Sequence, residues 1–203
     1  HGNYSTYLPR EYKIYNKSFH SCKHIYSVSE YSKNIFIKRI TNNIKIYVVP
    51  VGISTQQFYL EKKIKKENQI VFNGNLTKKR KGFEFLLNYI KEYDFKFKLV
   101  IISNHEINDL RAKKYLSILE EKKINYKVSS NISNDELRSI YNKSLFNFAC
   151  ANPDNKNDEY EGLNITILEA AACKTISIGS KNTANVCALK YGIGHLVEYD
   201  NLK

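Results

Sequence analysis

Tryptophan and methionine are absent from the 203 residues, and the four cysteines lie far apart, with no CxxC pair among them. Zinc sites and disulfide frameworks usually show closer spacing, so neither is expected here. Cys22, Cys150, Cys173 and Cys187 are therefore predicted to be reduced, partly buried thiols. A chain with no initiator methionine is expected to be a fragment or a processed product of a longer protein.

Long hydrophobic runs are also lacking. No apolar segment approaches the length of a membrane-spanning helix, and no signal peptide is visible, although a missing N-terminus would hide one. Short repeats and low-complexity segments are absent as well. These features favour a cytoplasmic globular protein, with peripheral contact to a membrane left open.

The charge is strongly positive: 32 Lys and Arg residues stand against 20 Asp and Glu residues, for a formal net charge of +12. This charge allows an anionic partner, such as nucleotide phosphates, an acidic membrane surface or nucleic acid. Many of the lysines, however, lie on expected helix faces, where a solvated surface is the default. No RNP, helix-turn-helix or zinc pattern is present, so no nucleic-acid partner is expected.

The C-terminal two thirds of the chain alternate between strand and helix patterns. This alternation predicts an α/β domain with an open parallel sheet and helices on both faces, which is a Rossmann-like fold. The expected strands are 70–74, 97–102, 124–129, 145–150, 175–179 and 196–197. The expected helices are 83–93, 106–123, 136–143, which a capping box at Ser133 and Glu136 opens, and the helix that follows Asn164.

The N-terminal part has its own pattern. A helix is expected from Ser29, which can cap it, and the strand 44–49 ends at Pro50. Residues 54–69 are polar and rich in lysine, and we interpret them as a linker. The predicted units are therefore residues 1–53, this linker, and the domain 70–203, which is expected to be truncated at its C-terminus.

One candidate site is the loop from Gly74 to Gly82, which follows the first strand of the domain. It carries three lysines and an arginine between two glycines. Glycine lets a backbone approach a ligand closely, and Arg80 or Lys81 could neutralise a diphosphate. The loop does not match the P-loop pattern, because Lys81 precedes Gly82. Taken alone, it is a weak signal and more typical of a solvated basic turn.

A second candidate is the segment from Glu161 to Lys174, which follows the 145–150 strand. Asn164 is the expected N-cap of its helix, with Glu161 in the loop before it and Glu169 in its second turn. The free N–H groups of a helix N-terminus favour an anion such as phosphate. An ordinary amphipathic helix is the default for this segment alone. Both loops follow strands of one sheet, however, and should meet at one edge, which favours a nucleotide-diphosphate site.

The same segment resembles the signature of glycosyltransferase family 4, which is retaining and has the GT-B fold. That signature is Glu, seven residues, Glu and Ala, and here it runs from Glu161 to Ala170. Four other motifs occur in the family's order. They are Val28-Ser29-Glu30, the hinge Val48-Val49-Pro50-Val51-Gly52-Ile53 with Phe58, the loop Gly74-Asn75-Leu76 with Arg80-Lys81-Gly82, and the tail Gly192-Ile193-Gly194-His195-Leu196-Val197.

The resemblance implies roles for individual residues. Lys81 matches the lysine that binds the donor diphosphate, and Glu169 the glutamate that accepts hydrogen bonds from the ribose. Glu161 matches the catalytic glutamate beside the transferred sugar. The backbone at Gly162, Leu163, Asn164, Ile165 and Thr166 would meet the sugar hydroxyls and phosphates, and Val128 lies near the expected place of the nucleobase.

His1 matches the catalytic-cleft histidine of the family's N-terminal domain by its distance from Val28, or it is the last residue of a trimmed tag. Other positions depart from the family pattern. Asn75 stands where the family usually has a phosphate-binding arginine, so neutralisation would depend more on Lys81 and Arg80. Val51 replaces the hinge asparagine, and Lys174 replaces a common glycine.

The sequence therefore predicts part of a retaining glycosyltransferase. Its substrate would be a nucleotide-diphosphate sugar of the UDP or GDP type, with no cofactor and no metal required. The acceptor would be a glycan, lipid or protein. Residues 1–53 would then be the end of an acceptor-side domain, so the chain alone could bind a donor without turning it over. The alternative is a non-catalytic module that binds a nucleotide sugar or a partner.

Overall fold

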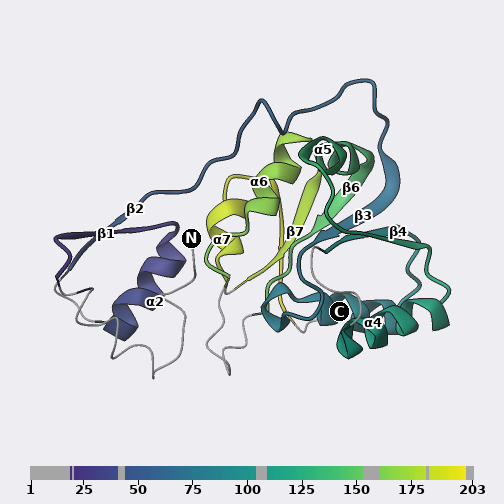
Figure 1. The fold of residues 1–203 in the computed structure, drawn as a ribbon, viewed down its shortest axis with the longest axis horizontal. Helices are drawn as coiled ribbons and strands as arrows, with labels where there is room; N and C mark the ends of the chain where they lie inside the picture. The colour runs from purple at the N-terminus through teal and green to yellow at the C-terminus, as the bar shows by residue number, and fades with distance from the viewer. Residues whose placement is uncertain are drawn as a thin grey trace.

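The computed structural model describes residue 19 and residues 21–40, 44–103, 109–152, 161–181 and 183–199. A six-stranded parallel sheet forms the main domain (Figure 1), in the order β5-β4-β3-β6-β7-β8. Its strands are β3 (Glu67–Asn73), β4 (Lys98–Ile102), β5 (Tyr126–Ser129), β6 (Ser144–Phe148), β7 (Ile176–Ser180) and β8 (Gly194–Val197). The expected Rossmann-like α/β sheet is confirmed.

Helices cover both faces of this sheet. They are α3 (Phe83–Glu92) and α4 (Leu110–Glu121) on one face, and α5 (Asn134–Lys143), α6 (Ile165–Ala172) and α7 (Asn185–Leu189) on the other. Side chains of β3 alternate between the two cores: Ile70 and Phe72 pack with α3 and α4, whereas Val71 packs with α5 and α6. This alternation explains why buried parallel strands are apolar throughout.

The N-terminal part forms a small separate unit of β1 (His24–Ser27), α2 (Glu30–Ile40) and β2 (Lys45–Val48), in which β1 and β2 pair in parallel. It lies to one side of the main domain in Figure 1. The Ser32 N–H donates to Ser29 Oγ at 3.0 Å, which confirms Ser29 as the cap of α2. The capping box of Ser133 and Glu136 is also confirmed, although α5 begins at Asn134.

The segment before β3 packs against the main domain. Phe58 is buried with its ring edge-on to Tyr141, and Glu61 Oε1 lies 2.8 Å from Arg138 Nε. Lys66 Nζ donates to the carbonyls of Tyr141 and Cys173, and burial lowers the pKa of Lys66 to about 8. The segment is thus fixed on α5, and β3 begins three residues before the expected strand.

Two short elements carry no signal in the sequence. One is α7, which has only five residues and therefore shows no full helical period. The other is a 3-10 turn, η2 (Lys79–Lys81), within the basic loop.

Candidate functional site

The strand order places both candidate loops at one point of the sheet. β3 and β6 are neighbours, yet the chain leaves β3 toward β4 and leaves β6 toward β7. This is a topological switch point, where ligands bind at the carboxyl ends of strands in open α/β sheets. The loop after β3 and the loop after β6 therefore emerge side by side, as the sequence predicts.

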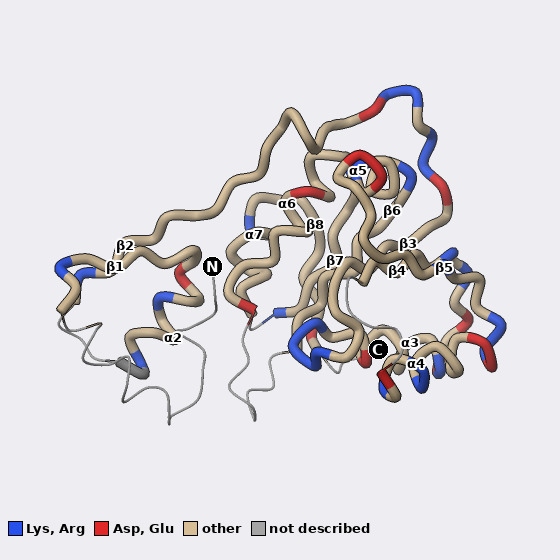
Figure 2. Tube along the Cα trace, in the orientation of Figure 1, with Lys and Arg blue, Asp and Glu red and all other residues tan. Residues whose placement is uncertain are grey.

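The basic loop is seated on the end of β6. Gly82 has a φ of 68°, and a Cβ atom there would lie 1.8 Å from the carbonyl oxygen of Cys150. The Asn152 N–H donates to the Arg80 carbonyl at 3.1 Å. Figure 2 shows the run of basic residues in the turn that precedes α3. Only glycine permits this close approach, which fixes the lysines and the arginine at the switch point.

Glu161 lies between two cations of this loop. Its Oε2 atom is 2.5 Å from Arg80 Nη1 and 3.0 Å from Lys81 Nζ, and its side chain is only 8% exposed. A buried carboxylate needs such partners, because an unpaired buried charge is strongly destabilising. Two cations and one carboxylate leave a net positive charge, which suits an anionic ligand.

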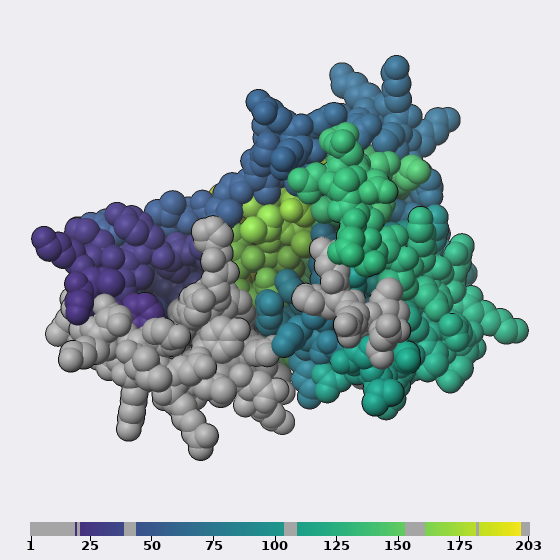
Figure 3. Space-filling model, in the orientation of Figure 1, coloured from purple at the N-terminus to yellow at the C-terminus, as the bar shows by residue number. Residues whose placement is uncertain are grey.

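The backbone next to Glu161 is held from the N-terminal unit. The Gly162 carbonyl accepts hydrogen bonds from Ser29 Oγ at 2.6 Å and from Ser32 Oγ at 3.1 Å, and both serines are buried. Figure 3 shows the yellow-green surface around α6 set back between the purple N-terminal unit and the green surface around α5. The sequence does not predict this contact: Ser29 is expected there as a helix cap and as part of the Val28-Ser29-Glu30 motif, with no partner across the chain.

The start of α6 differs from expectation in one respect. Asn164 is at the N-cap position, but its side chain makes no capping hydrogen bond to the helix. Its Oδ1 accepts from Thr166 Oγ1 at 2.8 Å, and its Nδ2 donates to the Ala149 carbonyl at 3.4 Å. The amide thus ties α6 to the end of β6 and does not satisfy the N–H groups of the first turn.

Glu169 is half-buried one turn further along α6. Its Oε2 accepts from the Tyr141 hydroxyl at 3.0 Å, and that hydroxyl accepts in turn from Asn73 Nδ2 at 3.1 Å. Burial raises the pKa of the Glu169 carboxyl, while the hydrogen bond from Tyr141 acts in the opposite direction. Tyr141 and Asn73 are absent from the residues that the sequence singles out, because nothing local in their sequence marks them.

The remaining predicted residues are less closely grouped. Asn75 Oδ1 accepts from the Thr77 N–H and the Thr77 hydroxyl, both at 2.9 Å, so the amide stabilises its own turn. Val128 is half-buried against the α3 and α4 core, on a strand separated from β3 by β4. Leu163 packs near Ile167, and Ile165 is 40% exposed. His1 lies outside the described residues.

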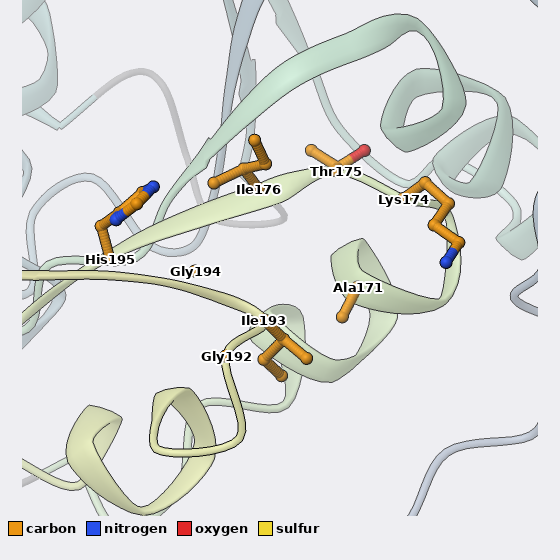
Figure 4. A pocket seen from close by; sticks show the side chains of 8 residues that line it. All are labelled: Ala171, Lys174, Thr175, Ile176, Gly192, Ile193, Gly194 and His195. Atoms are coloured by element: carbon orange, nitrogen blue, oxygen red, sulfur yellow. The ribbon is translucent and has the colours of Figure 1, made fainter.

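A cavity of about 310 Å³ lies elsewhere, where β7 and β8 begin. Lys174 and His195 lie at its two ends (Figure 4), and the backbone of Gly192 and Gly194 forms part of its wall. This is the opposite edge of the sheet from Lys81 and Glu161. In the described residues, no three His, Cys, Asp or Glu side chains gather in a way that could hold a metal ion.

Comparison with known protein families identifies the family of this chain. A family model described as "Glycosyl transferases group 1" matches residues 67–201, from the first residue of β3. The chain belongs to the group 1 glycosyltransferases. The family resemblance expected from the Glu161 to Ala170 signature is thereby confirmed.

Individual relatives agree with this family. The chain is 30% identical over 162 residues to a probable sucrose-phosphate synthase of Thermosipho melanesiensis, covering 75% of this chain and 36% of that protein. A sucrose-phosphate synthase structure from Thermosynechococcus elongatus has a TM-score of 0.75 at 15% identity, over 96% of this chain and 50% of that one. Anabaena HepE, solved with UDP and glucose, has a TM-score of 0.77 at 11% identity, over 97% and 55%.

These structural likenesses confirm the GT-B type of α/β fold. This glycosyltransferase chain spans about half the length of the two solved structures and 36% of the curated relative. None of the helices in the described ranges is both long enough and apolar enough to span a bilayer.

Proposed function

We propose that this group 1 glycosyltransferase chain is the donor-binding part of a retaining enzyme, which moves a sugar from a nucleotide diphosphate to a glycan, lipid or protein acceptor. The observation that carries the proposal is the cluster of Arg80, Lys81 and Glu161 at the switch point of the sheet. It brings two cations and one carboxylate together, and Glu161 belongs to the loop that leads into the N-terminus of α6. A UDP-type donor is favoured because HepE, a structural neighbour, was solved with UDP-glucose.

The chemistry follows from where charge develops. When the nucleoside diphosphate departs, negative charge accumulates on its β-phosphate, and cations held in advance at that position lower the barrier. In our proposal Lys81, Arg80 and the N–H groups from Gly162 to Thr166 supply this stabilisation. Glu161 lies beside the sugar and Glu169 accepts hydrogen bonds from the ribose. Two carboxylates acting as in a glycosidase are disfavoured, because Glu169 is assigned to the ribose.

Calorimetric titration with UDP and with GDP tests the site. We expect one of them to bind, and binding to be unaffected by EDTA if no metal is required. Lys81→Met should weaken binding about tenfold or more, because a charge-assisted hydrogen bond to phosphate is lost. Lys79→Met is the matched control, since Lys79 is an exposed lysine of the same 3-10 turn. Folded wild-type protein that binds neither nucleotide nor its sugars would refute the proposal.

Replacement of Glu169 should act on donor binding more than on transfer. Glu169→Ala is expected to weaken nucleotide binding about tenfold, because the ribose hydroxyls lose a charged acceptor. Glu84→Ala is the control: Glu84 also accepts a hydrogen bond from a buried tyrosine, Tyr115, but on the α3 and α4 side of the sheet. Equal affinities of the Glu169 and Glu84 variants would contradict the assignment.

The proposal also includes a cellular location. We place the enzyme in the cytoplasm, with its net charge of +12 available for an acidic membrane surface. Co-sedimentation with vesicles that contain anionic lipid, compared with neutral vesicles, tests that contact.

A non-catalytic nucleotide-sugar-binding module is the second candidate. It is favoured by Asn75, whose amide is occupied by Thr77 at the place where the family usually has an arginine. Transfer by the intact protein separates the two candidates.

A further inference from the structure

Two consecutive hydrogen bonds connect the end of β3 through α5 to α6. Asn73 Nδ2 donates to the Tyr141 hydroxyl at 3.1 Å, and this hydroxyl donates to Glu169 Oε2 at 3.0 Å. Asn73 is the residue immediately before Gly74, where the basic loop begins. These two hydrogen bonds therefore link the strand that carries the basic loop to the helix that carries Glu169.

Tyr141 is fixed at both ends. It is fully buried, and its ring lies edge-on to Phe58, with the centroids 6.2 Å apart. Its backbone carbonyl accepts hydrogen bonds from Lys66 Nζ and from the Thr175 hydroxyl. A side chain packed in this way loses its rotamer freedom on folding, before any ligand binds. Its hydroxyl is thus a donor at a set position.

Glu169 gains its orientation from that donor. The residue is only half-buried, and the hydrogen bond of 3.0 Å from Tyr141 reaches the Oε2 atom of its carboxylate. A glutamate side chain has several rotatable bonds, so an unheld carboxylate would have to be ordered when a ligand binds, at a cost in affinity. A second residue that holds the first is the usual way in which proteins avoid this cost.

We propose that Tyr141 is a positioning residue that fixes Glu169 for the ribose hydroxyls of the donor and thereby sets the preference for ribose over deoxyribose. This inference rests on the proposed function, in which Glu169 accepts those hydroxyls. Tyr141 does not touch the nucleotide in this arrangement. It acts through Oε2, and Asn73 supports it by donating to the tyrosine oxygen.

The test compares affinities for UDP and 2′-deoxy-UDP, or for the GDP pair if GDP is the nucleotide that binds. We define the ribose preference as the affinity for the ribonucleotide divided by the affinity for the deoxyribonucleotide. The contributions of the base and the phosphates cancel in this ratio. Wild-type protein should favour the ribonucleotide about tenfold, the magnitude of a hydrogen bond to a charged acceptor. Tyr141→Phe keeps the ring and removes the hydroxyl, and should reduce the ratio about fivefold. Tyr115→Phe is the matched control, because it removes a buried tyrosine hydroxyl from Glu84 and should leave the ratio unchanged.

The pH dependence of this ratio gives a readout that packing alone would not move. Burial raises the pKa of Glu169, so the ribose preference of the wild type should fall on acidification at a pH above the ordinary range of a glutamate. The hydrogen bond from Tyr141 lowers that pKa, so Tyr141→Phe should shift the midpoint to higher pH. Among the described residues, the titratable group that acts on the pKa of Glu169 is Tyr141. The pKa of Tyr141 itself is raised first by burial and then by Glu169 and Cys173, so the tyrosine stays protonated as a donor.

The outcomes are distinguishable. If no nucleotide binds the wild type, the proposed function itself fails. If UDP binds but the ratio and midpoint are the same in folded Tyr141→Phe as in the wild type, the positioning role is overturned while the function stands. Should Tyr141→Phe not fold, Asn73→Leu removes the donor to the hydroxyl. Asn73→Leu is expected to lower the ratio, as Tyr141→Phe would, and an unchanged ratio overturns the proposal.

Discussion

Glu161→Ala is expected to abolish sugar transfer by the intact enzyme, lowering kcat by about 100-fold or more. The loss should be this large because the proposed role of Glu161 is to act on the reacting sugar in the transition state, where single electrostatic contacts have effects of this size. The measurement is initial-rate transfer from the donor identified by titration. A variant that retains near-normal kcat would remove Glu161 from the chemistry.

Replacement of Glu161 should strengthen nucleotide binding, although it abolishes transfer. Glu161 Oε2 lies 2.5 Å from Arg80 and 3.0 Å from Lys81, so its charge competes with a diphosphate for the same two cations. The isosteric Glu161→Gln should therefore bind UDP or GDP more tightly than the wild type, by about fivefold for charges separated by a few ångströms. Lys81→Met, in contrast, should weaken nucleotide binding. Opposite changes in affinity in these two variants would identify competition between Glu161 and the diphosphate for the same cations. Weaker binding by Glu161→Gln would show that Glu161 supports the nucleotide directly.

Gly82→Ala should destabilise the fold by about 3 kcal/mol. Alanine at a φ of 68° costs about 1–2 kcal/mol, and the overlap with the Cys150 carbonyl adds a comparable steric penalty. The neighbour is backbone at the end of β6, so it cannot move aside as a flexible side chain could. Denaturant unfolding measures the change. Nucleotide affinity should fall as well, because a shift of the backbone at residue 82 would also displace the neighbouring Lys81.

Two other glycines separate these contributions. Gly192 has a φ of 75°, and a Cβ atom added there would meet nothing within 4 Å, so Gly192→Ala should show the backbone cost alone. Gly52 lacks both features, and Gly52→Ala should change the stability by less than about 0.5 kcal/mol. Equal effects at Gly82 and Gly192 would mean that the contact with Cys150 does not contribute.

Much of the fold could be predicted because its signals are local. Apolar runs such as Val71 and Phe72 mark a strand buried on both faces, and Ser133 with Glu136 marks the start of a helix. Elements with weak local signals escape prediction: α7 is too short for a periodic pattern, and η2 lies in a loop whose sequence indicates only its charge. Asn164 shows a further limit. A side chain of capping type can bond to another partner when the tertiary structure offers one, as Thr166 and Ala149 do here.

Chain order and residue type are enough to establish the parallel α/β sheet, the two loops at one edge and the resemblance around Glu161 and Glu169. Which groups meet is a property of the folded chain: Glu161 with Arg80 and Lys81, the Gly162 carbonyl with Ser29 and Ser32, and Glu169 with Tyr141. Such contacts join residues far apart in the chain. They depend on helix orientation and side-chain reach, which no spacing in the sequence records.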